Sequence, residues 1–434
     1  MAYAIKISEY PNNVAKQINS LLCLQPKQAG NKFAARGKKE APVFFLRVDE
    51  NFVHLPYLFA SSFFQVIPNV DFDFPRTEME FTGELRQNQI STEKEAWGML
   101  CNYGTSTLGL YPGFGKTILG AKLCSRTKLI TAVLVHREIL TSQWKKTFEE
   151  FTTAKVWIVG SEKPEGYSVI ICMDARWKSV SEKERDSVGF LIIDEAHSFC
   201  TRSRVDCLLA FHPKYILAET ATLERDDGME SMIYAICGKH GVFRQTNKPF
   251  CVTKVVTEIK PERKTDRMGN LEYGRMVKSV LENDDRNNGI LKIVENHPEN
   301  SILILTWLVD HTKLLHKELK SKNESCDYLC GAKKSYKDCR VLVGTMSKIG
   351  TGFDQATACA DYAGGEFDIL ILACSMRKIS MITQNVGRIR SQTPIIFCFV
   401  DDDPIFENHW RILKSWFLNR GGNIEEKSMK NLCL

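Results

Sequence analysis

Residues 109–117 read Gly-Leu-Tyr-Pro-Gly-Phe-Gly-Lys-Thr, and the architecture predicted for this chain follows from them. They come after a short apolar run typical of a strand, and residues 116–124 continue with apolar side chains at helical spacing. Gly113 and Gly115 carry no Cβ, so backbone N–H groups of the turn can close around phosphate oxygens. The positive end of the following helix adds to this attraction. The stretch therefore predicts a phosphate-binding turn between a strand and a helix.

Two side chains at the end of the turn predict a nucleoside triphosphate with its metal. Lys116 would reach the β- and γ-phosphates, and the Thr117 hydroxyl would hold Mg²⁺. The strict phosphate-loop pattern asks for glycine at the position of Leu110, so a chance glycine-rich turn is the alternative interpretation. The other motifs of the chain have to decide between the two.

Composition sets outer limits on the answer. A chain of 434 residues with 44% hydrophobic and 25% charged residues is long enough for about two to four domains with cores of their own. The formal net charge of +6 suits a nucleic-acid groove and suits a solvated surface equally well. The 15 cysteines form no Cys-x-x-Cys pair, and the longest apolar runs are far shorter than a membrane span. We expect a soluble, reduced, intracellular protein.

After the phosphate turn, apolar strands alternate with amphipathic helices. We expect strands at residues 129–135, 156–159, 168–173, 190–193 and 215–218 in the first half, and at 301–305, 340–343, 368–373 and 394–400 in the second. Fully apolar strands joined by helices specify parallel sheets with helices on both faces. Ligands of such sheets bind at the carboxyl ends of the strands. The predicted fold class is α/β, with two parallel-sheet domains in tandem.

Two adjacent carboxylates follow one of these strands. Residues 194–197 read Asp-Glu-Ala-His directly after the strand at 190–193. In a nucleotide site, Asp194 would hold Mg²⁺ directly or through water, and Glu195 would orient and deprotonate the attacking water. The acidic pair would also serve as a plain helix N-cap. Its coincidence with the phosphate turn favours the catalytic interpretation.

With these motifs in this order, the chain resembles superfamily 2 helicases and translocases from about residue 84 to about residue 400. Residues 85–89, Leu-Arg-Gln-Asn-Gln, resemble the family's adenine-reading segment, which places Arg86 and Gln89 at the nucleotide. Residues 217–228 resemble the family's Ser-Ala-Thr-Pro-x-Arg-x-Asp-Gly, with Thr220 in place of Ser. The resemblance implies that His197, Thr220 and Thr222 couple hydrolysis to the grip on nucleic acid.

The second domain carries the remaining motifs of that family. Residues 341–345 and 350–354 match the segments with a phosphate-contacting threonine and a ribose-contacting aspartate, which are Thr345 and Asp354 with Gly352 beside it. Residues 384–390, Gln-Asn-Val-Gly-Arg-Ile-Arg, match the last motif. The second arginine of that motif falls one position later in many relatives. The finger that neutralises charge on the γ-phosphate is therefore Arg388, Arg390 or both, with Gln384 at the nucleotide.

The resemblance implies a nucleic-acid-stimulated ATPase in which ATP and Mg²⁺ bind between two RecA-like domains. Its implied nucleic-acid contacts are Arg137, Arg176, Trp177, Thr306 and Thr345. The sequence is most similar to the DEAH-type branch that contains the excision-repair helicase XPB, and to the transcript-release DNA helicases of poxviruses. This implies movement from 3′ to 5′ on DNA by a monomer, with viral transcription machinery as a partner in an infected cell. A duplex translocase that separates no strands, and a nucleotide-dependent binding switch, stay open as alternatives.

The expected domain limits follow from the motifs. Residues 1–80, aromatic-rich and interrupted by prolines, predict a small α+β accessory module, and an N-terminal extension packed on the next domain is the alternative. The other segments are a first RecA-like domain at 81–250, a linker at 251–284, a second RecA-like domain at 285–403, and a C-terminal helix and tail at 404–434.

Overall fold

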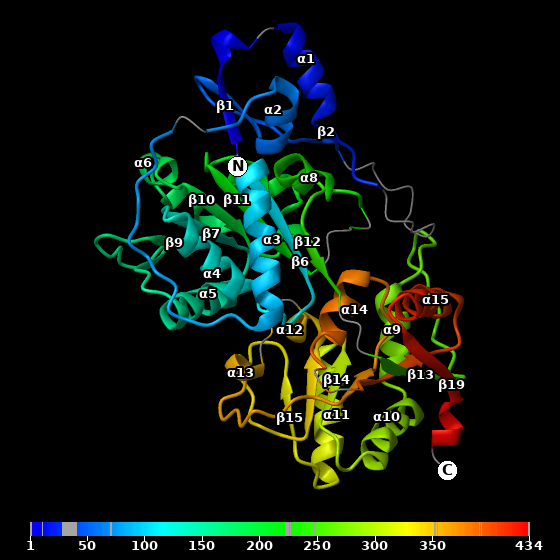
Figure 1. Cartoon of the computed structure of the whole chain (residues 1–434). Helices are drawn as coiled ribbons and strands as arrows, with labels where there is room; N and C mark the ends of the chain where they lie inside the picture. The colour runs from blue at the N-terminus through cyan, green and yellow to red at the C-terminus, as the bar shows by residue number, and fades with distance from the viewer. Residues whose placement is uncertain are drawn as a thin grey trace. The chain divides into compact units, whose positions relative to one another are not determined.

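The computed structural model describes residues 2–10, 12–27, 41–69, 72–221, 225, 227–245, 249–350, 353, 355–389, 391 and 393–432. In helices α13 and α14, the side chains of residues 356, 357 and 380 lie outside this description. The chain divides into two compact units: the elements from β1 to β12 belong to the first, and those from β13 to η5 to the second (Figure 1). Across the described residues, no helix is both long and apolar enough to cross a membrane.

The first unit begins with the predicted α+β module. Its elements are β1 (Ala2–Lys6), η1 (Ile7–Glu9), α1 (Asn12–Leu21), β2 (Cys23–Leu24), β3 (Val43–Phe44), β4 (Arg47–Val48), β5 (Phe52–Pro56) and α2 (Tyr57–Phe64). Strand β5 is central in an antiparallel sheet of order β1-β5-β4. Ile18, Val53 and Leu55 form the module's own core under α1 and α2.

Hydrogen bonds tie this module to the larger sheet of the same unit. The backbone N–H of Ala2 donates to the carbonyl of Phe211 at 3.0 Å. The Asn69 amide donates to the carbonyl of Pro213 at 3.0 Å, and the buried Tyr57 hydroxyl donates to that of Lys214 at 3.1 Å. All three acceptors lie in the loop that leads into β11, so the module is docked at one end of that strand.

The larger sheet of the first unit has seven parallel strands in the order β12-β6-β11-β10-β7-β9-β8. The strands are β6 (Thr105–Leu110), β7 (Thr131–Val135), β8 (Val156–Ile158), β9 (Val169–Met173), β10 (Phe190–Ile193), β11 (Tyr215–Thr220) and β12 (Val242–Arg244). The helices are α3 (Gln87–Tyr103), α4 (Lys116–Thr127), α5 (Glu138–Phe151), η2 (Asp174–Ser179), α6 (Glu182–Asp186), η3 (Ala196–Phe199), η4 (Arg202–Arg204), α7 (Val205–Leu208) and α8 (Ser231–Cys237).

Each face of this sheet has its own core, as expected for strands that are apolar on both sides. On one face Leu119 and Trp144 of α4 and α5 pack on Ile192. On the other, Phe199 and Met232 pack on Ile193. The strands predicted for the first half of the chain are present, and the predicted parallel α/β sheet is confirmed.

The second unit is also built on seven parallel strands, in the order β15-β16-β14-β17-β18-β13-β19. They are β13 (Phe250–Val256), β14 (Ile302–Thr306), β15 (Cys326–Leu329), β16 (Val341–Thr345), β17 (Ile369–Leu372), β18 (Ile395–Val400) and β19 (Gly422–Ser428). The helices are α9 (Tyr273–Leu281), α10 (Asp284–Asn296), α11 (Val309–Ser321), α12 (Met346–Ile349), α13 (Gln355–Ala358), α14 (Ile379–Val386), α15 (Pro404–Leu418) and η5 (Met429–Leu432).

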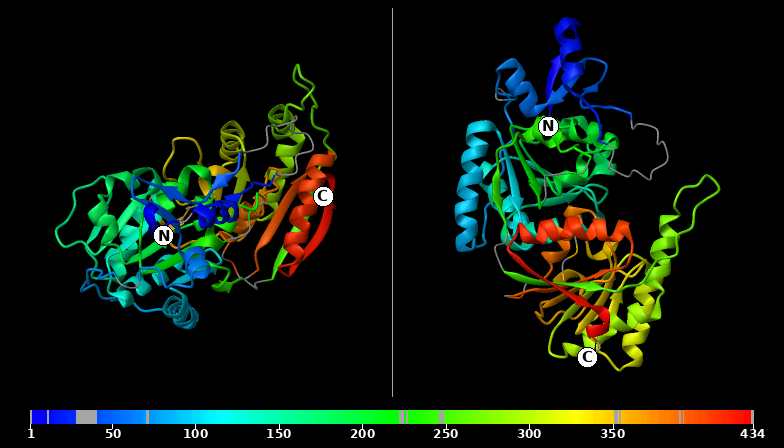
Figure 2. Two further views of the ribbon diagram at one scale, coloured as in Figure 1. Left: turned by 90° about the horizontal axis from the view of Figure 1, so that it is seen from above. Right: turned by 90° about the vertical axis from the view of Figure 1, so that its right-hand side faces the viewer.

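Two predicted boundaries of the second unit are corrected by this sheet. Residues 251–284, expected to be a linker, contain β13, which pairs with β18 on one side and β19 on the other. Residues 404–434, expected to be a helix and tail outside the domain, supply α15 and the edge strand β19 (Figure 2). β13 reads Phe-Cys-Val-Thr-Lys-Val-Val, a local pattern typical of a strand, whereas β19 is a strand only through its pairing with β13. Between β13 and α9 a loop with Met268 near its tip projects from this unit, and a single bridge from Thr265 to Leu271 closes it.

Candidate nucleotide and nucleic-acid sites

The phosphate turn has the backbone that its glycines predict. Strand β6 ends at Leu110 and helix α4 begins at Lys116. Between them Gly113 and Gly115 have φ angles of 82° and 97°, in the left-handed region that side chains disfavour. A Cβ on Gly115 would also collide with the side-chain amide of Gln89. Position 115 therefore requires glycine for two reasons: the left-handed backbone and the lack of room for a Cβ.

The departure from the strict pattern at position 110 has a structural explanation. Leu110 is the last residue of β6, and its side chain is fully buried in the core under α3 and α4. Its backbone is not among the positive-φ positions, so this site of the turn does not need glycine. The carbonyl of Leu110 accepts a hydrogen bond of 3.1 Å from the Lys116 ammonium.

The start of α3 is bonded directly to the phosphate turn. Gln89, only 1% exposed, donates its side-chain N–H to the carbonyl of Phe114 at 2.9 Å and accepts the backbone N–H of Arg86 at 2.8 Å. The Arg86 guanidinium also donates to Phe114 and, at 3.3 Å, to Gly113. Arg86 and Gln89, the two residues predicted to contact the nucleotide, therefore lie against the phosphate turn and donate hydrogen bonds to its carbonyl groups.

Asp194 is a buried acid held at the carboxyl end of β10. Its carboxylate accepts the indole N–H of Trp144 at 2.9 Å, and its backbone N–H donates to the carbonyl of Leu134 at 3.0 Å. Burial and the neighbouring Glu195 raise the pKa of Asp194 to about 6, while Lys116 opposes that rise. A buried carboxylate with a raised pKa gains most from a nearby cation, so this acid suits a metal ion.

Glu195 has a left-handed backbone, with φ 49° and ψ 52°, which is uncommon for a residue with a side chain. Such outliers concentrate at functional sites. One Glu195 carboxylate oxygen lies 3.4 Å from Nδ1 of His197, and the same nitrogen is 2.9 Å from the hydroxyl of Thr220. Burial, followed by the charge of Arg225, lowers the pKa of His197 to about 4, so this imidazole is neutral at pH 7.

Trp144 and Arg225 are functional contacts that residue-by-residue reasoning missed. Trp144 is one of the apolar positions of a helix expected at residues 138–148, and its indole N–H donates to Asp194. Arg225 forms a two-bond ion pair with Asp227 at 2.9 and 2.6 Å and donates to the carbonyl of His197 at 2.5 Å. For Arg225 the signal was in the sequence, because it lies inside residues 217–228, the stretch that resembles a family motif.

The predicted nucleic-acid contacts of the first unit lie at the ends of β7 and β9. Arg137 precedes α5, and burial lowers its pKa while Glu195 opposes that change. Trp177 in η2 is half-buried, and the guanidinium groups of Arg47 and Arg185 lie 5.8 and 5.5 Å from its ring centre. Arg176 is exposed and donates to the carbonyl of residue 159 at 3.1 Å.

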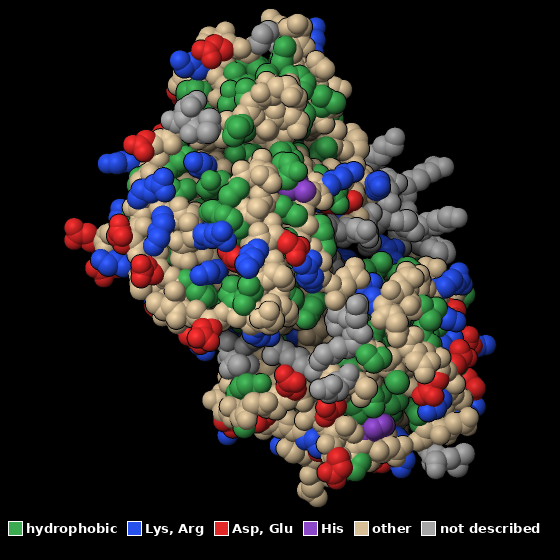
Figure 3. All heavy atoms as spheres, in the orientation of Figure 1, with side chains coloured by type: hydrophobic (Ala, Val, Ile, Leu, Met, Phe, Trp, Pro, Cys, Tyr) green, Lys and Arg blue, Asp and Glu red, His purple; other side chains and the backbone are tan. Residues whose placement is uncertain are grey.

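Lysine and arginine side chains also gather over α3 and α4, on the face of the first unit shown in Figure 3. Two basic residues of α4, Lys122 and Arg126, are used in structural contacts. Arg126 pairs with Glu93 at 2.7 Å and lies 4.3 Å from the ring centre of Trp97, and Lys122 lies 4.7 Å from that of Phe81. Part of the chain's net positive charge thus serves the packing of α3 and α4.

In the second unit, two predicted nucleic-acid contacts are buried. Thr306 is fully buried, and its hydroxyl lies 2.6 Å from that of Thr312. Thr345 is 2% exposed, with its hydroxyl 3.2 Å from that of Ser347. Trp307 next to Thr306 is 38% exposed, so of these neighbours it offers the larger surface.

The last motif lies on α14 and the turn after it. Gln384 is buried in α14, and the Arg388 guanidinium donates to the carbonyl of Gly350 at 2.8 Å. This bond joins the last motif to the segment that precedes the predicted ribose-contacting residue. Thr222, Gly352, Asp354 and Arg390 lie outside the described residues.

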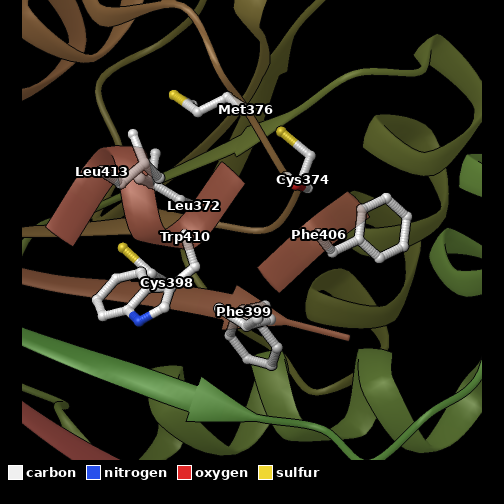
Figure 4. Close-up of a pocket in the computed structure, with 10 residues that line it drawn as sticks. Leu372, Cys374, Met376, Cys398, Phe399, Phe406, Trp410 and Leu413 are labelled. Atoms are coloured by element: carbon white, nitrogen blue, oxygen red, sulfur yellow. The ribbon is translucent and has the colours of Figure 1, made fainter. Parts of the chain in front are cut away.

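The second unit also contains a small apolar pocket (Figure 4). It is lined by Leu372, Cys374, Ser375, Met376, Cys398, Phe399, Val400, Phe406, Trp410 and Leu413. Burial raises the pKa of the Cys374 thiol to about 12, so this cysteine packs as a small apolar side chain. The pocket is part of the core under α15 and brings together none of the predicted site residues.

Comparison with known proteins places this geometry in a family. Residues 84–225 match the model of the type III restriction enzyme res subunit. The chain is 27% identical to "Putative helicase 161L" of Invertebrate iridescent virus 6, over 98% of this chain and 99% of that protein. It is 30% identical to "Putative helicase 109L" of Invertebrate iridescent virus 3, over 54% of this chain and 77% of that protein.

Further likenesses are weaker. The chain is 29% identical to the DNA 3′-5′ translocase XPB2 of Sulfurisphaera tokodaii, over 36% of this chain and 34% of that protein. It is 24% identical to the transcript termination protein A18 of Fowlpox virus, over 57% of this chain and 60% of that protein. Among solved structures, Dbp5 of S. cerevisiae bound to Gle1 has a TM-score of 0.53 at 13% identity, over 79% of this chain and 88% of that one.

The structural likeness confirms the predicted fold of two RecA-like α/β domains, and the chain's own structure adds the predicted N-terminal α+β module. The relatives confirm that the enzyme acts as a nucleic-acid helicase or translocase driven by ATP. With a phosphate turn, an Asp-Glu pair at a strand end and these relatives together, the chain belongs to the iridescent-virus family of superfamily 2 helicases and is an ATP-dependent helicase.

Proposed function

We propose that this protein is a DNA helicase that moves from 3′ to 5′ and separates strands by using ATP and Mg²⁺. One observation carries the nucleotide chemistry: the buried Asp194 and the strained Glu195 lie at the end of β10, and the charge of Lys116 from the phosphate turn acts on Asp194. Such an acid pair beside a phosphate turn suits metal-assisted hydrolysis of a phosphoanhydride. When bound, Mg²⁺ would neutralise charge on the phosphates.

The roles of the chain's own residues follow from their positions. Thr117 and Asp194 would hold the metal ion, which takes its remaining ligands from phosphates and water. Lys116, with the backbone of Gly113 and Gly115, would bind the phosphates. Glu195 would orient the attacking water and accept its proton.

Other residues complete the proposal. Arg86 and Gln89 would hold the nucleotide from α3. His197, Thr220 and Thr222 would couple the site to nucleic acid, and Arg225 would support His197 through its carbonyl. Arg388 and Arg390 are the candidates for the arginine finger, with Gln384, Gly352 and Asp354 as nucleotide contacts. Arg137, Arg176 and Trp177 are the candidate nucleic-acid contacts of the first unit. In the second unit the candidates Thr306 and Thr345 are buried, so the exposed Trp307 is the candidate with the larger accessible surface.

The relatives support the finer parts of this proposal. The name of XPB2 supports a DNA track and movement from 3′ to 5′. The name of A18 supports a role in ending transcription, and a partner in the viral transcription machinery of an infected cell. We propose that the protein works as a monomer inside the cell.

The test is ATP turnover by the wild type, Lys116→Ala and Glu195→Gln. Each is assayed without nucleic acid and with single-stranded or duplex DNA or RNA, at two salt concentrations. We expect DNA to stimulate the wild type, and the stimulation to weaken with salt because phosphate contacts release counterions. Glu195→Gln should bind ATP without turnover. Turnover that no nucleic acid changes, or an active Glu195→Gln variant, would overturn the proposal.

The name of XPB2, a translocase, favours a second candidate: movement along duplex DNA without separating strands. Displacement of a labelled strand from a duplex with a 3′ tail is expected of a helicase. Displacement of a third strand from a triplex, with the duplex left intact, would select the translocase instead.

A further inference from the structure

Glu219 is a fully buried acid that none of the roles above uses. It lies on β11, between β6 and β10, at the register position next to Leu108. Side chains alternate along a strand, so Glu219 shares the face of Leu217, which packs toward α4 and α5. Both of its carboxylate oxygens are buried, and neither has a hydrogen-bond partner among the described residues.

A buried carboxylate without hydrogen-bond partners needs an explanation. Buried polar groups are nearly always hydrogen-bonded, and a buried carboxylate without a partner is strongly disfavoured unless a cation or a proton compensates it. The positions of β11 that precede Glu219, Leu217 and Ala218, are apolar, and an apolar residue at 219 would avoid this cost. A compensating group close to Glu219 would account for the acid.

The surroundings of Glu219 point to the predicted metal site. A Cβ placed on Gly120 would lie 2.7 Å from a Glu219 carboxylate oxygen and 2.7 Å from the Trp144 ring. Gly120 is on the same face of α4 as Thr117, one turn further along the helix. Trp144 is the residue that bonds Asp194. Glu219 therefore lies behind the two proposed metal ligands, in space that Gly120 leaves open by having no side chain.

The charges that act on Glu219 are those of the nucleotide site. Burial and then Asp194 raise the pKa of Glu219 well above its ordinary value, Glu195 acts in the same direction, and Lys116 opposes them. Once ionised, three carboxylates beside one lysine would place excess negative charge in a buried region, so without a cation the protonated form of Glu219 is favoured. A divalent cation at Thr117 and Asp194 would compensate all three acids together.

We propose that Glu219 is a third carboxylate of the magnesium site, which strengthens Mg²⁺ binding from behind the two direct ligands through the water shell of the ion. Mg²⁺ gives up its water reluctantly and commonly keeps several waters in protein sites, so a carboxylate beyond the direct ligands can still contribute. Glu219 is a positioning residue in this proposal, since it would touch neither substrate nor metal. The inference rests on the proposed placing of Mg²⁺ at Thr117 and Asp194.

The experiment measures metal-dependent nucleotide binding, with no turnover involved. Binding of a fluorescent ADP analogue to the full chain is titrated with Mg²⁺ and repeated in EDTA. Glu219→Gln removes the charge and keeps the shape, and we expect the half-saturating Mg²⁺ concentration to rise at least about tenfold. Binding in EDTA should stay within about twofold of the wild type. Direct Mn²⁺ binding, followed by the loss of its free electron-resonance signal, should weaken by the same factor.

The control is Glu93→Gln, which neutralises another buried carboxylate of the same unit, one that pairs with Arg126. It should leave the Mg²⁺ titration unchanged. Glu219→Leu guards against a folding artefact: without metal it should melt above the wild type, and it should gain less from Mg²⁺ and ADP.

The outcomes separate this inference from the proposed metal site. An unchanged Mg²⁺ titration in Glu219→Gln, with a normal wild-type response, would overturn the role of Glu219 alone. A wild-type protein whose nucleotide binding ignores Mg²⁺, or an Asp194→Asn variant with the wild-type response, would overturn the metal site and this inference with it.

Discussion

Asp194→Asn should make the metal-free protein more stable while it removes activity. Asparagine has the shape of the acid, and its side-chain oxygen can still accept the Trp144 indole N–H. The substitution removes the negative charge of Asp194, which burial and the neighbouring Glu195 disfavour in the folded protein. The pKa of Asp194 is about 6 in the folded protein, against an ordinary value of 3.8. That difference of about 2 units corresponds to about 3 kcal/mol.

The pH dependence of this gain follows from the sign of the shift. Below about pH 4 the carboxyl is protonated in both folded and unfolded chains, so the aspartate carries no penalty. As the pH rises from about 4 to 6, the unfolded chain ionises first, and stability of the wild type is lost relative to the variant. Above about pH 6 the full difference of about 3 kcal/mol should be present.

Chemical unfolding of the wild type and Asp194→Asn, in EDTA from pH 4 to pH 8, tests this reasoning. Asp206→Asn, which changes an exposed acid in α7, is the matched control and should show no difference. Mg²⁺ with ADP should then stabilise the wild type and leave Asp194→Asn nearly unaffected. A variant less stable than the wild type at pH 7, or a gain equal at pH 4 and pH 7, would refute the argument.

Three further substitutions, the first with a control, test other parts of the structure. Gly115→Ala places a side chain at a φ of 97°, and it should abolish nucleotide binding and cost about 1–3 kcal/mol of folding free energy. Gly98→Ala in the open middle of α3 is its control and should stabilise the protein by about 0.5–1 kcal/mol in unfolding assays. Asp401→Asn breaks the fully buried ion pair with Arg286 in the second unit, and it should destabilise that unit by about 3–5 kcal/mol without changing nucleotide affinity. Thr220→Val removes the hydroxyl next to His197, and it should lower nucleic-acid stimulation of turnover several-fold while basal turnover stays within about twofold; equal losses of both would contradict a coupling role.

Much of the fold could be predicted because its signals are local. The C-terminal helix expected within residues 404–434 is present at Pro404–Leu418, where its apolar positions recur at helical spacing. Buried parallel strands such as Phe190–Ile193 are short apolar runs between turns. The edge strand β19 could not be found in this way, because it reads Gly-Asn-Ile-Glu-Glu-Lys-Ser and only its pairing with β13 makes it a strand.

In the candidate site, too, the features that are local in the sequence could be predicted and the long-range contacts could not. The phosphate turn and the Asp-Glu pair are contiguous in the chain, and the chemistry of a few neighbouring residue types was enough to predict both. The left-handed Glu195, the bond from Trp144 to Asp194 and the buried Glu219 join separate strands and helices. No spacing in the sequence records such contacts.

The sequence by itself therefore determined which residues can bind phosphate and metal, because that chemistry belongs to the side chains and to a short turn. Only the tertiary structure decided how strongly the acids of the site need a cation. Burial and mutual repulsion raise the pKa values of Asp194 and Glu219, and both effects exist only after β10, β11, α4 and α5 have packed together.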